Sequence, residues 1–125
     1  MSLVLTIGWI VAIALIVVGI VALLAPNALA GHYGVAVEGH GGAGFVRATG
    51  IRDVALGVIL AATAYYHALP LLIVFAIAGI AVSCADLFVA WHHGERRVRP
   101  AHAIHLGGIV AFVLILAMAL FAIGM

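Results

Sequence analysis

The sequence predicts an all-α protein, an up-down four-helix transmembrane bundle that forms one integral membrane domain over residues 1–125. Hydrophobic residues make up 68% of the chain and charged residues 7%, with a mean hydropathy of +1.40, which excludes an ordinary soluble domain. Four apolar stretches reach the roughly 20 residues that a helix needs to cross the hydrocarbon core, at about 3–25, 46–66, 69–91 and 103–124. Only short connections lie between them.

Each expected helix has a recognisable boundary. Residues 1–3 carry no Lys or Arg, and the apolar run after them is too long for a signal-peptide core, so we expect the first span to be retained. That span should end at Ala25, because Pro26 disfavours a helical conformation in the residue before it. The third span has Pro70 in its first turn, where proline is tolerated. The second and third spans are separated by only a few residues, so they should be antiparallel neighbours.

Positive charge predicts the orientation in the membrane. Alternating spans place the connections 26–45 and 92–102 on one side and both termini on the other. The chain has no Lys, and the Arg residues on the first side are Arg47, Arg96, Arg97 and Arg99. Because cytoplasmic loops carry an excess of positive charge, both connections should be cytoplasmic and both termini should lie on the outer side.

The first connection is rich in glycine and includes His32, Tyr33, Glu38 and His40. It lacks the spacing of a dinucleotide-binding loop and follows no strand, so phosphate binding is not expected. A pliable lid over the cytoplasmic end and a plain flexible loop both fit this composition. We favour the plain loop, because glycine runs most often mark nothing more.

Asp53 and Asp86 are the two acids set inside long apolar runs. A carboxylate at membrane depth is unfavourable unless it is paired, protonated or facing water. Both acids fall on stripes of small residues, which mark the faces on which membrane helices pack, and His105 heads the stripe of the fourth span. With a rise of about 1.5 Å per residue, all three lie roughly 3–11 Å below the cytoplasmic interface. We therefore expect these side chains to converge inside the bundle.

Arg52 lies about 100° around the helix from Asp53, off the centre of the stripe. Its guanidinium can reach into the bundle and pair with Asp86, or it can extend to the cytoplasmic interface. We favour the inward pairing, because Asp86 otherwise has no evident cation.

The chain resembles a known family at these positions. The segments concerned are Gly50-Ile51-Arg52-Asp53 followed by Gly57, Asp86 followed by His92-His93-Gly94, Ile104-His105-Leu106-Gly107, and the first loop from Ala25-Pro26 to Gly34-Val35. Together they resemble domain-of-unknown-function family 4267, small integral membrane proteins of bacteria and fungi. The resemblance covers nearly the whole chain and implies a four-helix membrane protein. It marks Arg52, Asp53, Asp86 and His105 as shared polar residues and implies no activity.

Three functions fit this cluster, and whether the protein is an enzyme stays open. The first is binding of a small lipophilic or amphipathic molecule, with acid–base isomerisation, cyclisation or epoxide opening as the associated chemistry. The second is a purely structural ion-pair network that fixes helix packing. The third is a small proton-coupled transporter, although four spans are few and no helix is interrupted at mid-membrane.

The candidate catalytic residues are Asp53, Asp86, His105 and Arg52. The candidate substrate-binding residues, on the same side, are His102, Trp91 and Arg47, although an interfacial aromatic belt also explains Trp91. We expect no metal or other cofactor, because no Cys-rich or His-Glu motif accompanies the histidines. The expected partners are the lipid bilayer and a small lipophilic ligand, with homo-oligomerisation left open. A net charge of +1 without a basic patch predicts no nucleic-acid binding.

Overall fold

The structure, a computed structural model, describes residues 2–30, 39–93 and 99–124. These residues form helices and turns without a strand. The helices are α1 (Leu3–Leu24), α2 (Pro26–Ala30), α3 (Gly39–Tyr65), α4 (Leu69–His93) and α5 (Arg99–Ala122). The all-α prediction is thereby confirmed.

Most predicted boundaries agree with the structure. α1 ends before Ala25, whose φ of −134° leaves the helical region ahead of Pro26, and α4 has Pro70 as its second residue. The turn between α3 and α4 is short and places His67 at a φ of 54°. Left-handed backbone at one residue lets the chain reverse within a few residues, which makes α3 and α4 antiparallel.

The predicted connection 26–45 contains helical residues at both of its ends. α2 begins at Pro26, and α3 begins at Gly39 rather than at residue 46. Glycine lowers helix propensity by about 1 kcal/mol per residue, but no proline interrupts residues 39–46, so the helix continues beyond its apolar run. The middle of the expected lid or loop, residues 31–38, lies outside the described residues. Arg96 and Arg97 of the connection 92–102 also lie outside them.

Three helical segments are long and apolar enough to cross a membrane, namely Leu3–Leu24, Leu69–His92 and His102–Ala122. They indicate a membrane protein. α3 is longer than any of them but differs in composition, because it carries Arg47, Arg52 and Asp53. The second predicted span, 46–66, is therefore the one whose charge sets it apart from the other three.

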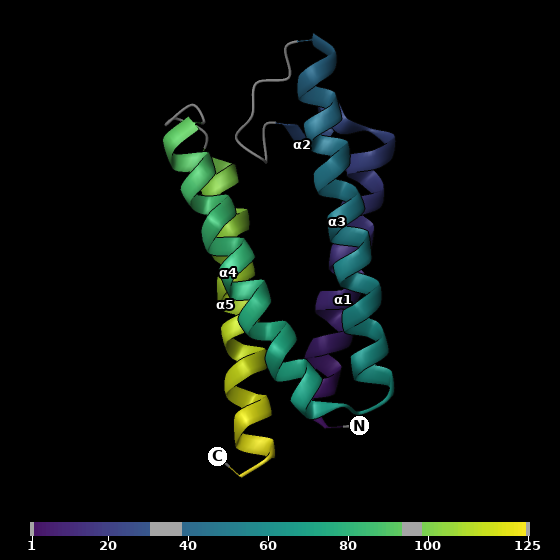
Figure 1. The fold of residues 1–125 in the computed structure, drawn as a ribbon, viewed down its shortest axis with the longest axis vertical. Helices are drawn as coiled ribbons and strands as arrows, with labels where there is room; N and C mark the ends of the chain where they lie inside the picture. The colour runs from purple at the N-terminus through teal and green to yellow at the C-terminus, as the bar shows by residue number, and fades with distance from the viewer. Residues whose placement is uncertain (1, 31–38, 94–98, 125) are drawn as a thin grey trace.

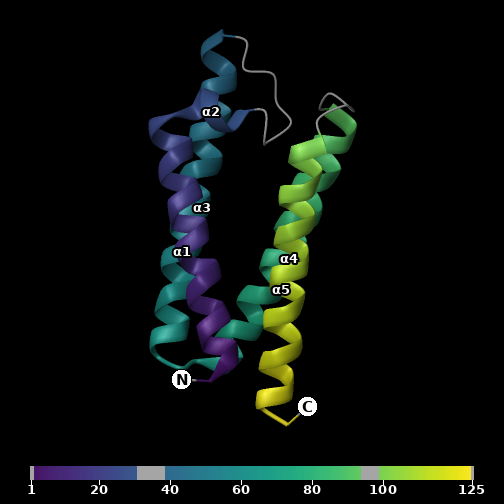
Figure 2. The same cartoon turned by 180° about the vertical axis from the view of Figure 1, so that it is seen from behind.

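The long helices form two pairs. α1 runs alongside α3, and α4 runs alongside α5 (Figure 1). The pairs approach each other at the end that holds both termini, and they diverge towards the end that holds α2, as the opposite view also shows (Figure 2). Contacts within each pair are far more extensive than contacts between pairs.

Glycine explains how closely α1 and α3 pack. A Cβ atom added to Gly50 would lie 2.7 Å from the Gly19 carbonyl oxygen and 2.8 Å from Ala22 Cβ. One added to Gly57 would lie 2.8 Å from the Ala12 carbonyl oxygen. The two backbones are thus in contact, as expected where small residues face each other on membrane helices. The small residues Ala12, Gly19 and Ala22 of α1 therefore pack against α3 of the same chain.

The main apolar core lies at the end of the molecule that holds the termini. It is built from buried residues of all four long helices, chiefly Val4, Leu5, Leu60, Leu72, Phe75, Phe112 and Ile115. A second, smaller core near α2 joins Ala22, Ala30 and Val46. Between these two cores the helix pairs diverge, and the buried Asp53, Ser83 and His105 lie there.

We predict that Gly50→Ala lowers the free energy of unfolding in detergent by about 1–3 kcal/mol, because the added methyl group overpacks the α1–α3 contact. Gly44→Ala is the matched control, since nothing lies within 4 Å of a Cβ atom added there. Thermal or denaturant unfolding followed by circular dichroism measures both. Equal stability of the two variants would contradict the close contact.

Candidate functional site

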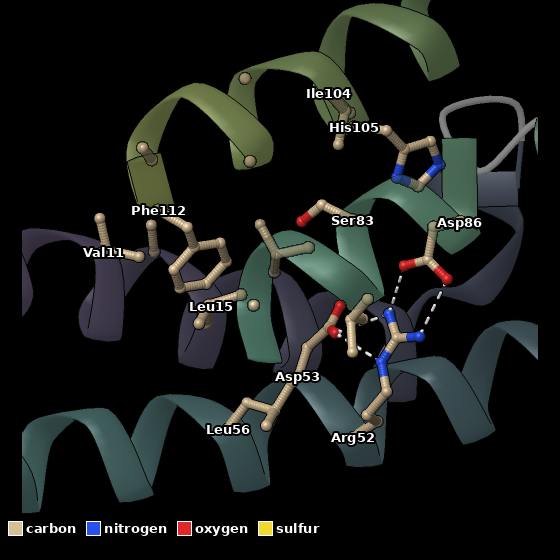
Figure 3. Close-up of a pocket in the computed structure, with 17 residues that line it drawn as sticks. Val11, Leu15, Arg52, Asp53, Leu56, Ser83, Asp86, Ile104, His105 and Phe112 are labelled. Carbon is tan, nitrogen blue, oxygen red and sulfur yellow. Dashed lines mark hydrogen bonds and ion pairs between the residues drawn. The ribbon is translucent and has the colours of Figure 1, made fainter. Parts of the chain in front are cut away.

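A cavity of about 280 Å³ lies between the two helix pairs. All four long helices contribute to its lining. Most of the lining is apolar, and Val11, Leu15, Leu56 and Phe112 are among its larger side chains (Figure 3). Its polar side chains are Arg52, Asp53, Ser83, Asp86 and His105. The volume is just below the roughly 300–1,000 Å³ of pockets that hold drug-sized ligands, so the cavity suits a smaller molecule.

Arg52 connects the two helix pairs through the acids. Its Nη1 and Nη2 atoms donate to Asp86 Oδ1 and Oδ2 at 3.1 and 2.9 Å, a bidentate pair between α3 and α4. Its Nε and Nη2 atoms also donate to Asp53 Oδ1, at 3.3 and 3.1 Å. The predicted inward pairing of Arg52 with Asp86 is therefore confirmed. Figure 3 shows the guanidinium between the two carboxylates.

The geometry matches what charged groups need away from water. A guanidinium has five N–H donors in a planar fork, and a bidentate carboxylate pairing uses two of them in parallel. Asp53 is 6% exposed, so a partner for its charge is required. Arg52 and Asp86 are half-buried. The pair is therefore neither sealed in the core nor fully solvated.

His105 supplies a different polar group to the same cavity. Its side chain comes from α5, is 7% exposed, and lies beside Asp86 in Figure 3. An imidazole can donate or accept a proton, which a guanidinium cannot do. The cavity thus combines two carboxylates, one fixed cation and one proton-exchanging group.

Small residues bring α4 and α5 together below the polar cluster. A Cβ atom added to Gly79 would lie 2.7 Å from the Phe112 ring, and one added to Gly108 would lie 2.9 Å from Ser83 Oγ. Ser83 lies one turn before Asp86 on α4, so its hydroxyl reaches the same cavity. Ser83 was not among the site residues predicted from the sequence, and its three-residue spacing to Asp86 was the available signal.

The four candidate catalytic residues all line this cavity, whereas the three candidate substrate-binding residues do not. Trp91 is 61% exposed, with its ring centroid 5.8 Å from that of His102. Arg47 donates from Nε to the Leu23 carbonyl oxygen at 3.4 Å. Trp91 lies five residues after Asp86, and Arg47 five before Arg52, which turns each by about 140° around its helix. These residues were predicted from their position on the same side of the membrane, but that position alone did not make them part of the cavity lining.

In residues 2–30, 39–93 and 99–124, no group of three or more His, Cys, Asp or Glu side chains is placed to hold a metal ion. His102 has a buried Nε2 atom without a hydrogen-bond partner among the described residues, but it lies beside Trp91 and outside the cavity. The polar atoms of the cavity are instead grouped around Arg52.

These features define a helical membrane protein with a polar cluster in an internal cavity. The chain belongs to the family described as Domain of unknown function (DUF4267), which matches residues 12–120. The matched region includes Arg52, Asp53, Asp86 and His105, so the family resemblance seen in the sequence is confirmed. No curated protein and no solved structure matches the chain.

A double-mutant cycle on Arg52→Gln and Asp86→Asn should give a coupling energy of about 1–2 kcal/mol in unfolding experiments, because the two side chains share a bidentate contact. A parallel cycle on Arg47→Gln and Asp86→Asn is the control. Arg47 hydrogen-bonds within the α1–α3 pair and should show no coupling to Asp86. Equal coupling in the two cycles would contradict a specific Arg52–Asp86 interaction.

Proposed function

We propose that this protein binds a small lipophilic or amphipathic molecule in the cavity between its helix pairs. The observation that carries the proposal is a mostly apolar cavity of about 280 Å³ whose polar side chains are grouped around Arg52. Ligand sites commonly combine an apolar wall with a few convergent polar groups. The apolar part of the ligand lies against Leu15 and Phe112, and its polar end faces Asp53, Asp86 and His105.

The proposal includes an up-down four-helix arrangement in which α3 also crosses the membrane. The outward face of α3 is apolar, with Ile51, Val58 and Ile59 all exposed. Its threonine hydroxyls are satisfied within the helix, because Thr49 donates to the Phe45 carbonyl oxygen and Thr63 to that of Leu60. Arg52 and Asp53 face the cavity rather than lipid. α3 therefore has the surface of a membrane helix despite its charges.

The cavity has an opening through which a lipophile can enter from the bilayer. Among its lining residues, Ala14 and Val18 of α1 and Ile104 and Gly107 of α5 are exposed. All four are small or apolar, so the edges of the opening between α1 and α5 are compatible with the hydrocarbon tails of the lipids. A molecule dissolved in the bilayer can reach the polar cluster by this route without crossing the aqueous phase.

The same geometry supports acid–base chemistry as the associated activity. A carboxylic acid or an imidazole can donate a proton at one end of a bound molecule while a carboxylate accepts one. Asp86 and His105 lie on neighbouring helices at the same part of the cavity (Figure 3). The reaction types are isomerisation, cyclisation or epoxide opening of a lipophilic substrate.

A structural role is the second candidate function. Arg52 joins α3 to α4 where other contacts between the pairs are sparse. A buried ion pair of this kind can fix how helices pack without any ligand. The two candidates differ in whether the cavity is occupied by a specific molecule.

We predict that native mass spectrometry of the protein, released from nanodiscs made without detergent, shows a bound small lipophile. Gly107→Leu should lose at least about 90% of it at unchanged thermal stability, because a Cβ atom added to Gly107 meets nothing within 4 Å and its side chain narrows the opening. Gly44→Leu, which also has free space and lies away from the cavity, should keep the ligand.

If the wild type carries no lipophile, or if both glycine variants retain it equally, binding in this cavity is wrong and the structural role is favoured. Incubating the bound molecule with the protein and then reanalysing its mass and chromatographic retention separates an enzyme from a binder. A changed molecule indicates catalysis, and an unchanged one indicates binding alone.

The proposed orientation places the connections 26–45 and 92–102 in the cytoplasm and both termini outside. We predict that, in a Cys84→Ser background, a membrane-impermeant thiol reagent added to intact cells labels His67→Cys but not Asn27→Cys. His67 lies in the α3–α4 turn and Asn27 in α2, at opposite ends of the molecule (Figure 1). The reverse labelling pattern would show the opposite orientation, and labelling of both would contradict a crossing by α3.

A further inference from the structure

Ser83 places an unpaired hydroxyl group in the cavity. The residue is 9% exposed and belongs to the cavity lining, and Figure 3 shows its oxygen pointing into the cavity. Within residues 2–30, 39–93 and 99–124, this hydroxyl has no hydrogen-bond partner. A buried hydroxyl without a partner is unfavourable by about 1–3 kcal/mol, so the site is completed by a molecule that supplies one.

The threonine hydroxyls of the chain behave differently. Each donates to a backbone carbonyl oxygen three or four residues earlier, as Thr6, Thr49 and Thr63 do. Hydroxyls on membrane helices ordinarily use this local bond, because hydrocarbon offers no acceptor. Gly79 and Ile80 carry the equivalent acceptors for Ser83, and both lie in the described part of α4, yet Ser83 donates to neither. Its hydroxyl is therefore directed away from the local bond and into the cavity.

Gly108 of α5 leaves room beside this hydroxyl. A Cβ atom added to Gly108 would lie 2.9 Å from Ser83 Oγ, so a side chain at this position would occupy the place next to the oxygen. Gly108 itself lines the cavity. The hydroxyl of Ser83 is thus accessible to a molecule that fills the space between α4 and α5.

The level of Ser83 lies between the polar and the apolar parts of the cavity. Asp86 is three residues later on α4, about 4.5 Å along the helix axis. The Phe112 ring lies beside Gly79, about one turn before Ser83. A molecule with its polar end at Asp86 and its apolar part against Phe112 therefore passes the hydroxyl of Ser83.

We propose that Ser83 determines ligand specificity by donating a hydrogen bond to a carbonyl or ether oxygen within the apolar part of the bound molecule. This inference rests on the proposed function and adds the chemical class of its ligand, an oxygen-bearing lipophile such as a ketone, ester or epoxide. A site that hydrogen-bonds its ligand rejects the analogue without that group, because its own buried polar atom is then left unpaired. A plain hydrocarbon chain is rejected for this reason.

The test compares methyl octyl ketone with its methylene analogue, in which a methylene group replaces the carbonyl oxygen in nearly the same shape. Nanodiscs that contain the protein are equilibrated with empty nanodiscs and both probes, recovered by an affinity tag, and assayed by gas chromatography. The excess of each probe over the empty nanodiscs measures binding without partitioning. We expect the wild type to bind the ketone about three- to tenfold tighter than the analogue, the effect of one hydrogen bond.

Ser83→Ala assigns the preference to the hydroxyl. It should reduce the ratio of ketone to analogue to within about twofold and leave binding of the analogue unchanged. Cys84→Ala is the matched control, because Cys84 is the next residue of α4, is exposed and does not line the cavity. It should keep the wild-type ratio. Gly107→Leu should lose both probes, which places their binding in the cavity.

Infrared difference spectra of ketone with an isotope-labelled carbonyl give a readout that a packing role of Ser83 would not change. A hydrogen bond from Ser83 weakens the carbonyl bond, so the stretching band should lie at lower wavenumber in the wild type than in Ser83→Ala. Should Ser83→Ala not fold, the band of the ketone bound to the wild type is compared with its band in empty nanodiscs. A lower wavenumber supports the inference, and coincident bands contradict it.

The outcomes separate this inference from the proposed function. If the wild type binds the ketone and the methylene analogue equally, the inferred ligand class is wrong while binding of a lipophile stands. A preference for the ketone that persists in Ser83→Ala would also overturn the inference, because another group would then be the donor. If neither probe exceeds its level in the empty nanodiscs, the proposed function itself fails.

Discussion

The ion pair between Arg52 and Asp86 is the interaction on which the rest of the structure depends. It spans the two helix pairs at a level where apolar contacts between them are sparse, and Asp53 shares the same guanidinium. Charged groups held in a low-dielectric interior must find partners, so the presence of two acids requires a cation between them. Arg52 therefore satisfies both acids and joins the two helix pairs.

The molecule is divided into a packed end and an open end. Near the termini, residues such as Leu60, Leu72 and Ile115 fill the space between all four long helices. One to two turns away, glycine and serine replace larger side chains on α4 and α5, and the polar cluster occupies the interior. A cavity remains between the two helix pairs at that level.

Much of this arrangement could be predicted from the sequence, because apolar length and small-residue spacing are local patterns. They located the helices and the inward phase of Asp53, Asp86 and His105. The start of α3 was missed, since nothing local marks where a glycine-rich helix begins. Trp91 and Arg47 were misplaced relative to the cavity because membrane depth was considered without helix phase. The pairing of α1 with α3 depends on packing between distant segments, which a single sequence does not reveal.

An experimental structure in a lipid environment tests the central claim most directly. The account predicts density for an elongated molecule between α1 and α5, with its polar end within hydrogen-bond distance of Asp53 or Asp86 and the Arg52–Asp86 pair intact. A structure in which the helix pairs close together, with Leu15 and Phe112 filling the cavity and no room beside Asp53, would contradict it.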